Sequence, residues 1–391
     1  MSLPLSGLRV LDLSRLLPGP FATLVLADLG ADVVKVEEPS GGDWVRSLPP
    51  LVGEASGAFH ALNRNKRSIG LNVRRPEGAA ALRRLARRAD VVVESFRPGV
   101  MERLGVGYDA LRAENPRMVL CSISGYGQDG PYRLRAGHDL DYCATAGVLA
   151  LNGPSERPVP LGIQAADVAG GAWPAVAGIL AALVRRVATG EGAHVDVSMT
   201  EGVLALLAMP LGIAHARGTP LVRGAELLSG GAACYDVYRT RDGRFVALGA
   251  LEPKFFGGFC AAVGRPELSA RQLEEGGRGP HAELEAIFAS RTRAEWAAFA
   301  AEHDVCLAPV LEGDEPADDP QLRARGAFVE VDTPWEGRPV RGVATPIRMD
   351  GAAAPRRPAP RLGEHTSAVL AEGGFSAEEI AALGLAGITA G

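Results

Sequence analysis

Short apolar runs alternate with amphipathic segments of helical length over the first 125 residues. The run at 8–13 (LRVLDL) is followed by a helical stretch that ends before Gly30, and a second apolar run follows at 33–37. Further runs of strand length lie at 68–73, 91–95 and 118–124, and helical patterns lie at 77–88 and 108–114. Strands and helices that alternate at this spacing predict an α/β fold, in which a parallel sheet is covered by helices.

The loop after the first strand argues against a dinucleotide cofactor. A glycine-rich phosphate loop would stand here in a Rossmann fold, but the chain has Pro18-Gly19-Pro20. Each proline lacks the N–H group that would bind a pyrophosphate. We therefore expect a Rossmann-like sheet that binds neither NAD nor FAD.

Helical patterns dominate beyond residue 140. A long apolar helix is expected over 167–187, and strands at 234–239 and 244–248 form a predicted β-hairpin around Asp242-Gly243. The remaining expected elements are helices at 253–263, 281–290, 293–303 and 377–383 and a strand at 305–311. A polar, glycine-containing join at 217–231 marks where a second domain would begin.

Composition argues against a nucleic-acid-binding protein, a membrane protein and a metal-binding protein. Lys+Arg 41 against Asp+Glu 46 gives a net charge of −5, so no global charge draws the chain to nucleic acid or to anionic lipid. The longest apolar core, 176–184, ends at Arg185-Arg186, well short of the roughly 18 residues that a membrane span needs. Five scattered cysteines and seven histidines show no metal-ligand spacing, so we expect a reduced, cytoplasmic protein without a metal.

Basic residues are concentrated between His60 and Arg103. This segment holds eleven basic and four acidic residues. The arginines at 83, 84, 87 and 88 are typical of a solvated helix face. The basic residues at strand ends and in loops instead suit a phosphate ligand, because guanidinium groups bind phosphate oxygens in pairs: Arg64, Lys66, Arg67, Arg97 and Arg103. Nucleic acid is the competing ligand, but no nucleic-acid motif accompanies these residues.

Five ordered motifs resemble the family III CoA-transferases (CaiB/BaiF type), a group that includes alpha-methylacyl-CoA racemase. They are 7–13 (GLRVLDL) with Pro18-Gly19-Pro20, 26–37 (LADLGADVVKVE), 65–71 (NKRSIGL), 94–107 (ESFRPGVMERLGVG) and 124–131 (SGYGQDGP). Three further motifs are similar to the racemase branch: 137–142 (GHDLDY), 166–171 (ADVAGG) and 251–255 (LEPKF). The four consecutive glycines of the transferase branch have no counterpart here.

The resemblance implies an acyl-CoA substrate and three catalytic residues. Inversion of the carbon next to a thioester needs a base on one face and an acid on the other, and His138 and Asp167 suit these roles. Glu252 would orient His138 and favour its protonated form. The implied substrate and CoA contacts are Leu16, Asn63, Arg64, Lys66, Arg97, Arg103, Tyr126, Gly130 and Asp139. Glu38 stands where some racemases have an arginine.

The resemblance also implies an architecture. A large α/β domain at 1–200 would be followed by a linker at 201–230 and a smaller α+β domain at 231–318, and 319–391 would return to the large domain. Two such chains would interlock as a homodimer. No cofactor is implied beyond the CoA thioester.

Three functions remain open. The first is a racemase that inverts the 2-methyl centre of an acyl-CoA by proton transfer through an enolate. The second is a CoA-transferase, in which Asp167 would attack the thioester and carry the acyl group as an anhydride. The third is a non-catalytic protein that binds acyl-CoA or nucleic acid.

Overall fold

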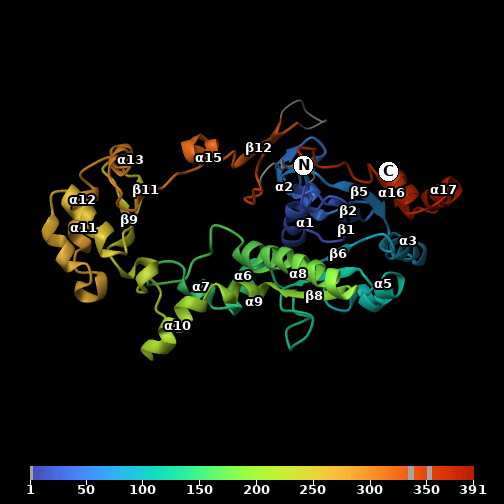
Figure 1. The fold of residues 1–391 in the computed structure, drawn as a ribbon, viewed down its shortest axis with the longest axis horizontal. Coiled ribbons are helices and arrows are strands. Elements are labelled where there is room, and N and C mark those ends of the chain that lie inside the picture. The colour runs from blue at the N-terminus through green and yellow to red at the C-terminus, as the bar shows by residue number, and fades with distance from the viewer. Residues whose placement is uncertain (1–2, 333–338, 350–354) are drawn as a thin grey trace. The chain divides into compact units, whose positions relative to one another are not determined.

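The chain is described here by a computed structural model that covers residues 3–332, 339–349 and 355–391 (Figure 1). It divides into two compact units. The sheet unit comprises Met1–Ala146, Ile163–Leu206 and Pro320–Gly391, and the small unit comprises Gly147–Gly162 and Leu207–Asp319.

This division differs from the predicted boundaries in two places. Residues 147–162 belong to the small unit because the Arg223 guanidinium donates hydrogen bonds to the carbonyls of Ala150, Pro154 and Ser155 at 2.7–3.0 Å. The predicted linker at 201–230 contains most of one helix, α9 (Met199–Ala205), and all of another, α10 (Ala208–Arg217).

A seven-stranded sheet organises the sheet unit. Its strand order is β14-β5-β2-β1-β6-β7-β8, and every neighbouring pair is parallel except β14 with β5. The strands are β1 (Arg9–Asp12), β2 (Asp32–Glu37), β5 (Arg67–Leu71), β6 (Val91–Glu94), β7 (Val119–Ser124), β8 (Ala193–Ser198) and β14 (Thr389–Ala390). The predicted α/β class and its first five strands are confirmed, whereas β8 and β14 were not expected.

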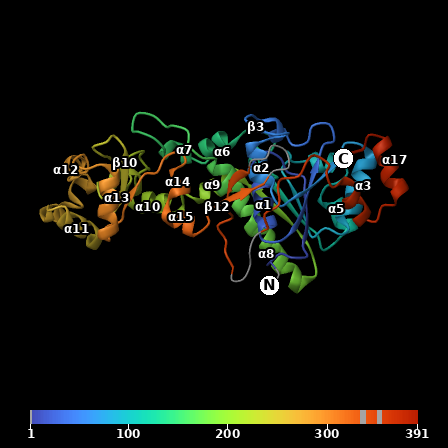
Figure 2. The same ribbon diagram turned by 90° about the horizontal axis from the view of Figure 1, so that it is seen from above.

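Helices complete the sheet unit. They are α1 (Pro18–Asp28), α2 (Gly57–Asn63), α3 (Pro76–Ala86), α4 (Val100–Arg103), α5 (Tyr108–Glu114), α6 (Asp139–Thr145), α8 (Trp173–Thr189), α9, α15 (Pro320–Ala324), α16 (Thr366–Glu372) and α17 (Ala377–Leu385). Short two-stranded ribbons join β3 (Leu51–Val52) to β4 (Ala55–Ser56), and β12 (Phe328–Val331) to β13 (Val340–Val343). The C-terminal helix α17 lies beside α3 (Figure 2), where Glu379 pairs with Arg84 at 2.9 Å.

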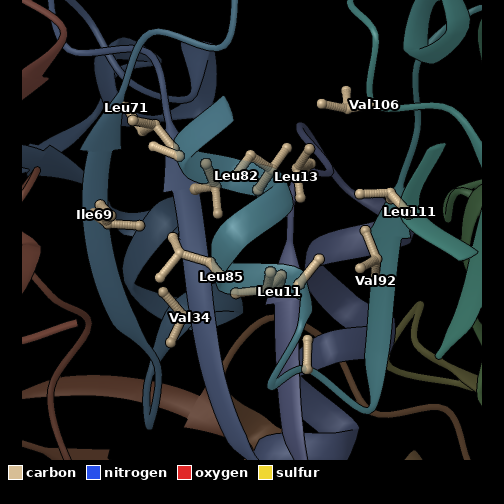
Figure 3. Close-up of a cluster of buried hydrophobic side chains, with 14 of the residues drawn as sticks. Leu11, Leu13, Val34, Ile69, Leu71, Leu82, Leu85, Val92, Val106 and Leu111 are labelled. Carbon is tan, nitrogen blue, oxygen red and sulfur yellow. The ribbon is translucent and has the colours of Figure 1, made fainter. Parts of the chain in front are cut away.

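The main core forms where α3 packs on the sheet. Leu82 and Leu85 of α3 lie over Leu11, Val34 and Ile69 of three adjacent strands, and all five side chains are buried (Figure 3). The amphipathic pattern of α3 places these leucines on one side of the helix while Arg84 contacts solvent and α17. The local pattern thus fixes which face of α3 is buried.

The direction in which successive strands are added to the sheet reverses at β1. From β1 the chain builds outward through β2 and β5 on one side, and then through β6, β7 and β8 on the other. In open α/β sheets, ligands bind beyond the carboxyl ends of the strands at such a reversal. The crevice beyond β1 and β6 is therefore the expected ligand site.

The long apolar helix proves longer than the sequence analysis allowed. Residues 166–189 form one continuous helical segment, long and apolar enough by length and composition to span a membrane. Its second part, α8, packs against α1, β7 and β8, and nearly half of its most apolar stretch is buried within the molecule. Helix α8 thus packs one side against the sheet and leaves Val184 and Val187 exposed on the other.

The first turns of this helical segment, Ala166–Ala172, are a π-helix that lies directly against α9. The backbones approach closely because Gly170 faces Gly202. A Cβ atom on Gly202 would lie 1.9 Å from the Gly170 carbonyl oxygen, and one on Gly170 would lie 2.6 Å from the Met199 carbonyl oxygen. Only glycine fits at either position.

The small unit combines a three-stranded antiparallel sheet with helices. Its strands are β9 (Tyr235–Arg239), β10 (Phe245–Gly249) and β11 (Leu307–Pro309), in the order β11-β10-β9, which confirms the predicted hairpin. The helices are α7 (Val148–Leu151), α10, α11 (Pro253–Ala262), α12 (His281–Phe288), α13 (Arg293–Glu302) and α14 (Glu315–Asp318). Stacked aromatic rings form its core, with Phe288 between Tyr238 and Phe259.

The Gly170–Gly202 contact can be tested with a single methyl group. Gly202→Ala would drive a Cβ into backbone that cannot move aside, so we expect the free energy of unfolding to fall by about 3 kcal/mol. Gly212→Ala is the matched control, because Gly212 is also helical and a Cβ atom added there would meet nothing within 4 Å. Urea unfolding followed by circular dichroism measures both; equal stabilities would contradict the close approach.

Candidate active site

A pocket of about 310 Å³ lies at the carboxyl edge of the sheet, at the expected crevice. Four loops contribute to it, and each follows one strand: Arg15–Pro18 after β1, Ser95–Pro98 after β6, Gly125 after β7 and Met199 after β8. Its remaining lining residues come from β7, from the loop before α6, from α6 and from the π-helix: Ile123, Ser124, Arg133, Arg135, Ala136, Gly137, His138, Tyr142 and Asp167.

The loop after β1 has a defined but unusual backbone conformation. Leu16 has a left-handed φ of +65°, and its N–H donates to Asp43 Oδ1 at 3.2 Å. Asp43 is fully buried and pairs at 2.9 Å with the equally buried Lys35 Nζ. Lys35 in turn donates to the carbonyl of Ser14 at 3.0 Å. Two buried, oppositely charged side chains thus hold this wall of the pocket.

Asp12 and Lys66 extend the same buried network. Lys66 Nζ donates to Asp12 Oδ2 at 3.2 Å, to the Pro20 carbonyl at 2.9 Å and to Asn63 Oδ1 at 2.9 Å. Burial opposes ionisation of Asp12, but the charges of Lys66 and Lys35 outweigh it and lower the pKa of this carboxyl to about 2. Burial lowers the pKa of Lys66 to about 8, against the opposing charge of Asp12.

The structure buries the side chains of three of the predicted CoA contacts. The side chains of Asn63, Arg64 and Lys66 are buried and bonded within the chain, and none of them lines the pocket at the carboxyl edge. Arg64 pairs with buried Asp28 at 2.5 Å. These side chains bond within the protein around the loop between α2 and β5, and their contact with CoA stays a prediction.

His138 and Asp167, by contrast, line the same pocket. His138 immediately precedes α6. The backbone N–H of His138 donates to Asp141 Oδ2 at 2.9 Å, and this bond fixes the start of that helix. The Asp167 N–H donates to Asp139 Oδ1 at 3.0 Å. Asp139 therefore connects the π-helix that carries Asp167 to the helix that follows His138. Asp139 itself is not among the residues that line the pocket.

The carboxyl group of Asp167 titrates near neutrality. Burial is the largest cause and the nearby charge of Asp139 adds to it, while His138 opposes them; together they raise the pKa of Asp167 from 3.8 to about 6. A carboxyl with such a pKa accepts and returns protons readily at physiological pH.

One tyrosine lines the pocket, and a second packs against it. The Tyr142 hydroxyl donates to the Gly137 carbonyl at 2.6 Å, and its ring meets Tyr126 edge-on at 5.2 Å between centroids. Burial, with the charge of Asp167, raises the pKa of Tyr142 to about 12, so this hydroxyl remains protonated. Tyr126 thus supports the pocket through Tyr142.

The other predicted residues are placed as follows. Leu16 and Arg97 line the pocket, whereas Arg103 is an exposed residue at the end of α4 and Gly130 lies in an exposed turn with φ +78°. Glu252 belongs to the small unit, where it is exposed at the start of α11. Its role toward His138 stays a prediction.

Three arginines of the pocket were missed from the sequence: Arg15, Arg133 and Arg135. All three lie outside the basic segment between His60 and Arg103, from which the phosphate contacts were predicted. Two arginines only three and five residues before a candidate catalytic histidine were the available signal.

The described residues contain no cluster of three or more His, Cys, Asp or Glu side chains suited to a metal ion. The pocket instead combines one titrating carboxyl group, one imidazole and several guanidinium groups. This set can move a proton or present a carboxylate nucleophile near a bound anion.

A family model for CoA-transferase family III matches residues 5–366. The chain belongs to CoA-transferase family III. It is 38% identical to human alpha-methylacyl-CoA racemase over 381 residues, which cover 96% of this chain and 95% of the human protein. It is 36% identical to the succinate–glutarate CoA-transferase of Agrobacterium fabrum, with 94% of this chain and 95% of that protein covered.

A solved structure shares this fold. The crystal structure of a CaiB/BaiF family protein from Brucella suis superposes with a TM-score of 0.83 at 34% identity, and covers 95% of this chain and 100% of that chain. Racemases and CoA-transferases thus match this family III chain at similar identity, so membership alone does not choose between the two reactions.

The pKa of Asp167 can be tested through stability. A folded-state pKa of about 6 lies above the ordinary 3.8, so the folded protein holds this proton more tightly than the unfolded chain does. The resulting stabilisation is fully present below about pH 4 and is lost as the pH rises through about 6. We therefore expect Asp167→Asn to raise the free energy of unfolding near pH 8 by about 1–3 kcal/mol and to change it little near pH 4. Urea unfolding at both pH values measures this; the same difference at both would contradict the raised pKa.

Proposed function

We propose that this family III chain is an acyl-CoA racemase that inverts the 2-methyl centre of its substrate. The observation that supports it is that His138 and Asp167 line one pocket, with the pKa of Asp167 at about 6. One side chain removes the α-proton, the electron pair passes into the thioester enolate, and the other side chain delivers its proton to the opposite face. Near pH 7 most of Asp167 is ionised and serves as the base.

We propose that Arg97 and Arg103 bind the CoA moiety. Arg97 lines the pocket and Arg103 is exposed on α4, which follows the same loop. No ion pair within the described residues engages either guanidinium, so both are available to phosphate oxygens. Their contribution would weaken as salt concentration rises.

A CoA-transferase is the second candidate. Its support is the carboxylate of Asp167 in the pocket, together with relatives named as CoA-transferases for glutarate, oxalate and mesaconate. In this reaction Asp167 attacks the thioester carbonyl, the CoA thiolate leaves, and the acyl group remains as an anhydride on Asp167. The thiolate then attacks the Asp167 carbonyl of the anhydride, which releases the donor acid and leaves CoA as a thioester on Asp167. The acceptor carboxylate attacks this thioester to form a new anhydride, and the thiolate attacks the acceptor's carbonyl, which gives the new acyl-CoA and frees Asp167.

We also propose a cytoplasmic homodimer that needs no cofactor besides its substrate. The support for association is apolar surface: Leu204 of α9 is 41% exposed and Leu206 beyond it 54% exposed. Burial of such side chains between two chains is favourable.

The two reactions predict different consequences of losing His138. A racemase needs both proton carriers, so His138→Ala and Asp167→Ala should each abolish racemisation, while each retains slow α-proton exchange with a different enantiomer. A transferase loses all turnover in Asp167→Ala but tolerates His138→Ala. Deuterium uptake from each enantiomer, measured by mass spectrometry beside CoA transfer to a panel of acids, separates them.

His215→Ala is the control, because His215 is exposed on α10, in the small unit. It should leave exchange unchanged. Transfer that survives His138→Ala, with no exchange in the parent enzyme, would reject the racemase in favour of the transferase.

The role of Arg97 predicts a change in KM. Arg97→Ala removes a charge-assisted contact, so KM for the acyl-CoA should rise about 10- to 100-fold while kcat changes much less. Arg112→Ala removes an exposed arginine of α5 outside the pocket and should leave KM unchanged. Steady-state kinetics at low salt measures both, and an unchanged KM in both Arg97→Ala and Arg103→Ala would refute the CoA contact.

A further inference from the structure

We infer that Glu94 is a positioning residue of this pocket: its carboxylate holds the loop at 95–98 in the arrangement that presents Arg97 to CoA. This inference rests on the proposed contact between Arg97 and CoA, and it adds the group that keeps this arginine in place. It applies equally to the racemase and to the transferase, because both reactions begin with a bound CoA thioester.

Glu94 ends β6 with its side chain inside the molecule. It is 3% exposed, and it is not among the residues that line the pocket. Its Oε2 atom accepts the backbone N–H of Phe96 at 2.7 Å, and the next residue of the loop is Arg97. A hydrogen bond to an ionised acceptor is stronger than one between neutral groups. This carboxylate therefore sets the direction in which the chain leaves β6 toward the pocket.

The backbone on the far side of Arg97 is also held. The Arg97 carbonyl accepts the N–H of Val100 at 3.1 Å, and Pro98 disfavours the helical conformation for the residue that precedes it. Because the backbone is bonded on both sides of Arg97, a ligand that binds its side chain does not need to order the loop. This lowers the entropic cost of binding.

The loop is attached to the neighbouring wall of the pocket as well. Ser95 Oγ accepts the N–H of Arg15 at 3.1 Å, and the Arg15 guanidinium carbon lies 5.5 Å from the centroid of the Phe96 ring. Phe96 thus connects the loops after β1 and β6, and its N–H is the group that Glu94 holds. Loss of this bond would release Phe96 and the adjacent Arg97 together.

A row of polar side chains across three strands fixes the Glu94 side chain. Glu94 is paired in register with Ser122 of β7, whose hydroxyl donates to the Glu94 carboxylate. Ser122 Oγ lies 2.9 Å from Nε2 of His194 on β8, and the His194 ring stacks on Tyr108 with 5.2 Å between centroids. Since the serine hydroxyl has one hydrogen and gives it to Glu94, Nε2 of His194 is the donor to Ser122. The row ends at His194, which is exposed.

Glu94 titrates near neutral pH. Burial is the largest cause, and it raises the pKa of this carboxyl to about 7. The charges of Glu102 and Asp196 add to this effect, and the bonds that Glu94 accepts from the hydroxyl and the backbone N–H oppose it. The titratable groups around the row come from α4, α5, β7 and β8: Glu102, Tyr108, Asp109, Cys121, His194 and Asp196. Above about pH 7 the ionised carboxylate therefore holds Phe96 more firmly than the protonated form does at lower pH.

Glu94→Gln tests this role, because glutamine has the size and the hydrogen-bonding groups of the protonated glutamic acid. At pH 5.5 the Kd of the variant for coenzyme A should equal that of the parent within about twofold. At pH 8.5 it should be about 3- to 10-fold higher, since only the parent then has the charged acceptor. Calorimetry measures both without turnover. The comparison of two proteins at one pH cancels the titration of the CoA phosphates.

A double variant shows whether Glu94 acts through Arg97. In an Arg97→Ala background, Glu94→Gln should change the Kd at pH 8.5 by less than about twofold, because the loop no longer carries the contact. Glu191→Gln is the matched control. Glu191 is exposed between α8 and β8, outside the pocket, and its substitution should not change the Kd at either pH.

Urea unfolding separates a local effect from a loss of fold. The pKa of Glu94 in the folded protein, about 7, lies above the ordinary 4.5, so its stabilisation is present below about pH 4.5 and is lost as the pH rises through 7. Glutamine does not ionise, so Glu94→Gln should be at least as stable as the parent at pH 8.5. Weaker CoA binding by this stable variant would then come from the loop.

Three results would overturn the inference. An equal ratio of Kd values at both pH values would show that the ionised carboxylate does not hold the loop. Tighter binding by Glu94→Gln at pH 8.5 would show that the charge of Glu94 repels the bound phosphates directly. The same loss with and without Arg97 would show that Glu94 acts elsewhere. Arg97→Ala with the Kd of the parent would instead reject the proposed CoA contact, and with it the basis of this inference.

Discussion

The pocket depends on a group of alternating charges buried beneath the loop after β1. Asp12, Lys66, Lys35 and Asp43 are almost completely removed from solvent and contact one another and the loop backbone. Such groups contribute little net stability, since desolvation offsets much of their attraction, but the loss of one leaves its partners uncompensated. Their consequence here is conformational: Lys35 and Asp43 bind the backbone at Ser14 and Leu16, so the loop has one arrangement.

A steric constraint places the carboxyl group of Asp167. Asp167 lies in the first turn of a π-helix, a form that is rare in proteins and frequent at functional sites. The contact between Gly170 and Gly202 holds this π-helix against α9, and the N–H of Asp167 bonds to Asp139. Asp167 is thus fixed both by its own helix and by the one that follows His138.

The pocket combines a carboxyl group of raised pKa with several guanidinium groups. Burial and the charge of Asp139 raise the pKa of Asp167, which keeps a proton available close to neutral pH. The arginines that line the same pocket favour an anion beside this carboxyl group. The same arrangement suits proton transfer and nucleophilic attack, which explains how one family fold accommodates racemases and CoA-transferases.

The sequence by itself determined the first five strands of the sheet and its helices α1, α3 and α5, because periodicity carries that information. Its motifs also singled out His138 and Asp167, which line one pocket. It did not predict the edge strands β8 and β14: β8 is half polar and β14 has two residues, and both are strands only because β7 and β5 pair with them. It also could not separate Lys66, buried against Asp12, from Arg135, which lines the pocket. Charge is a property of the residue, but burial and partners are set by segments distant in the chain, so only the tertiary structure decided which basic groups are buried within the protein and which line the pocket.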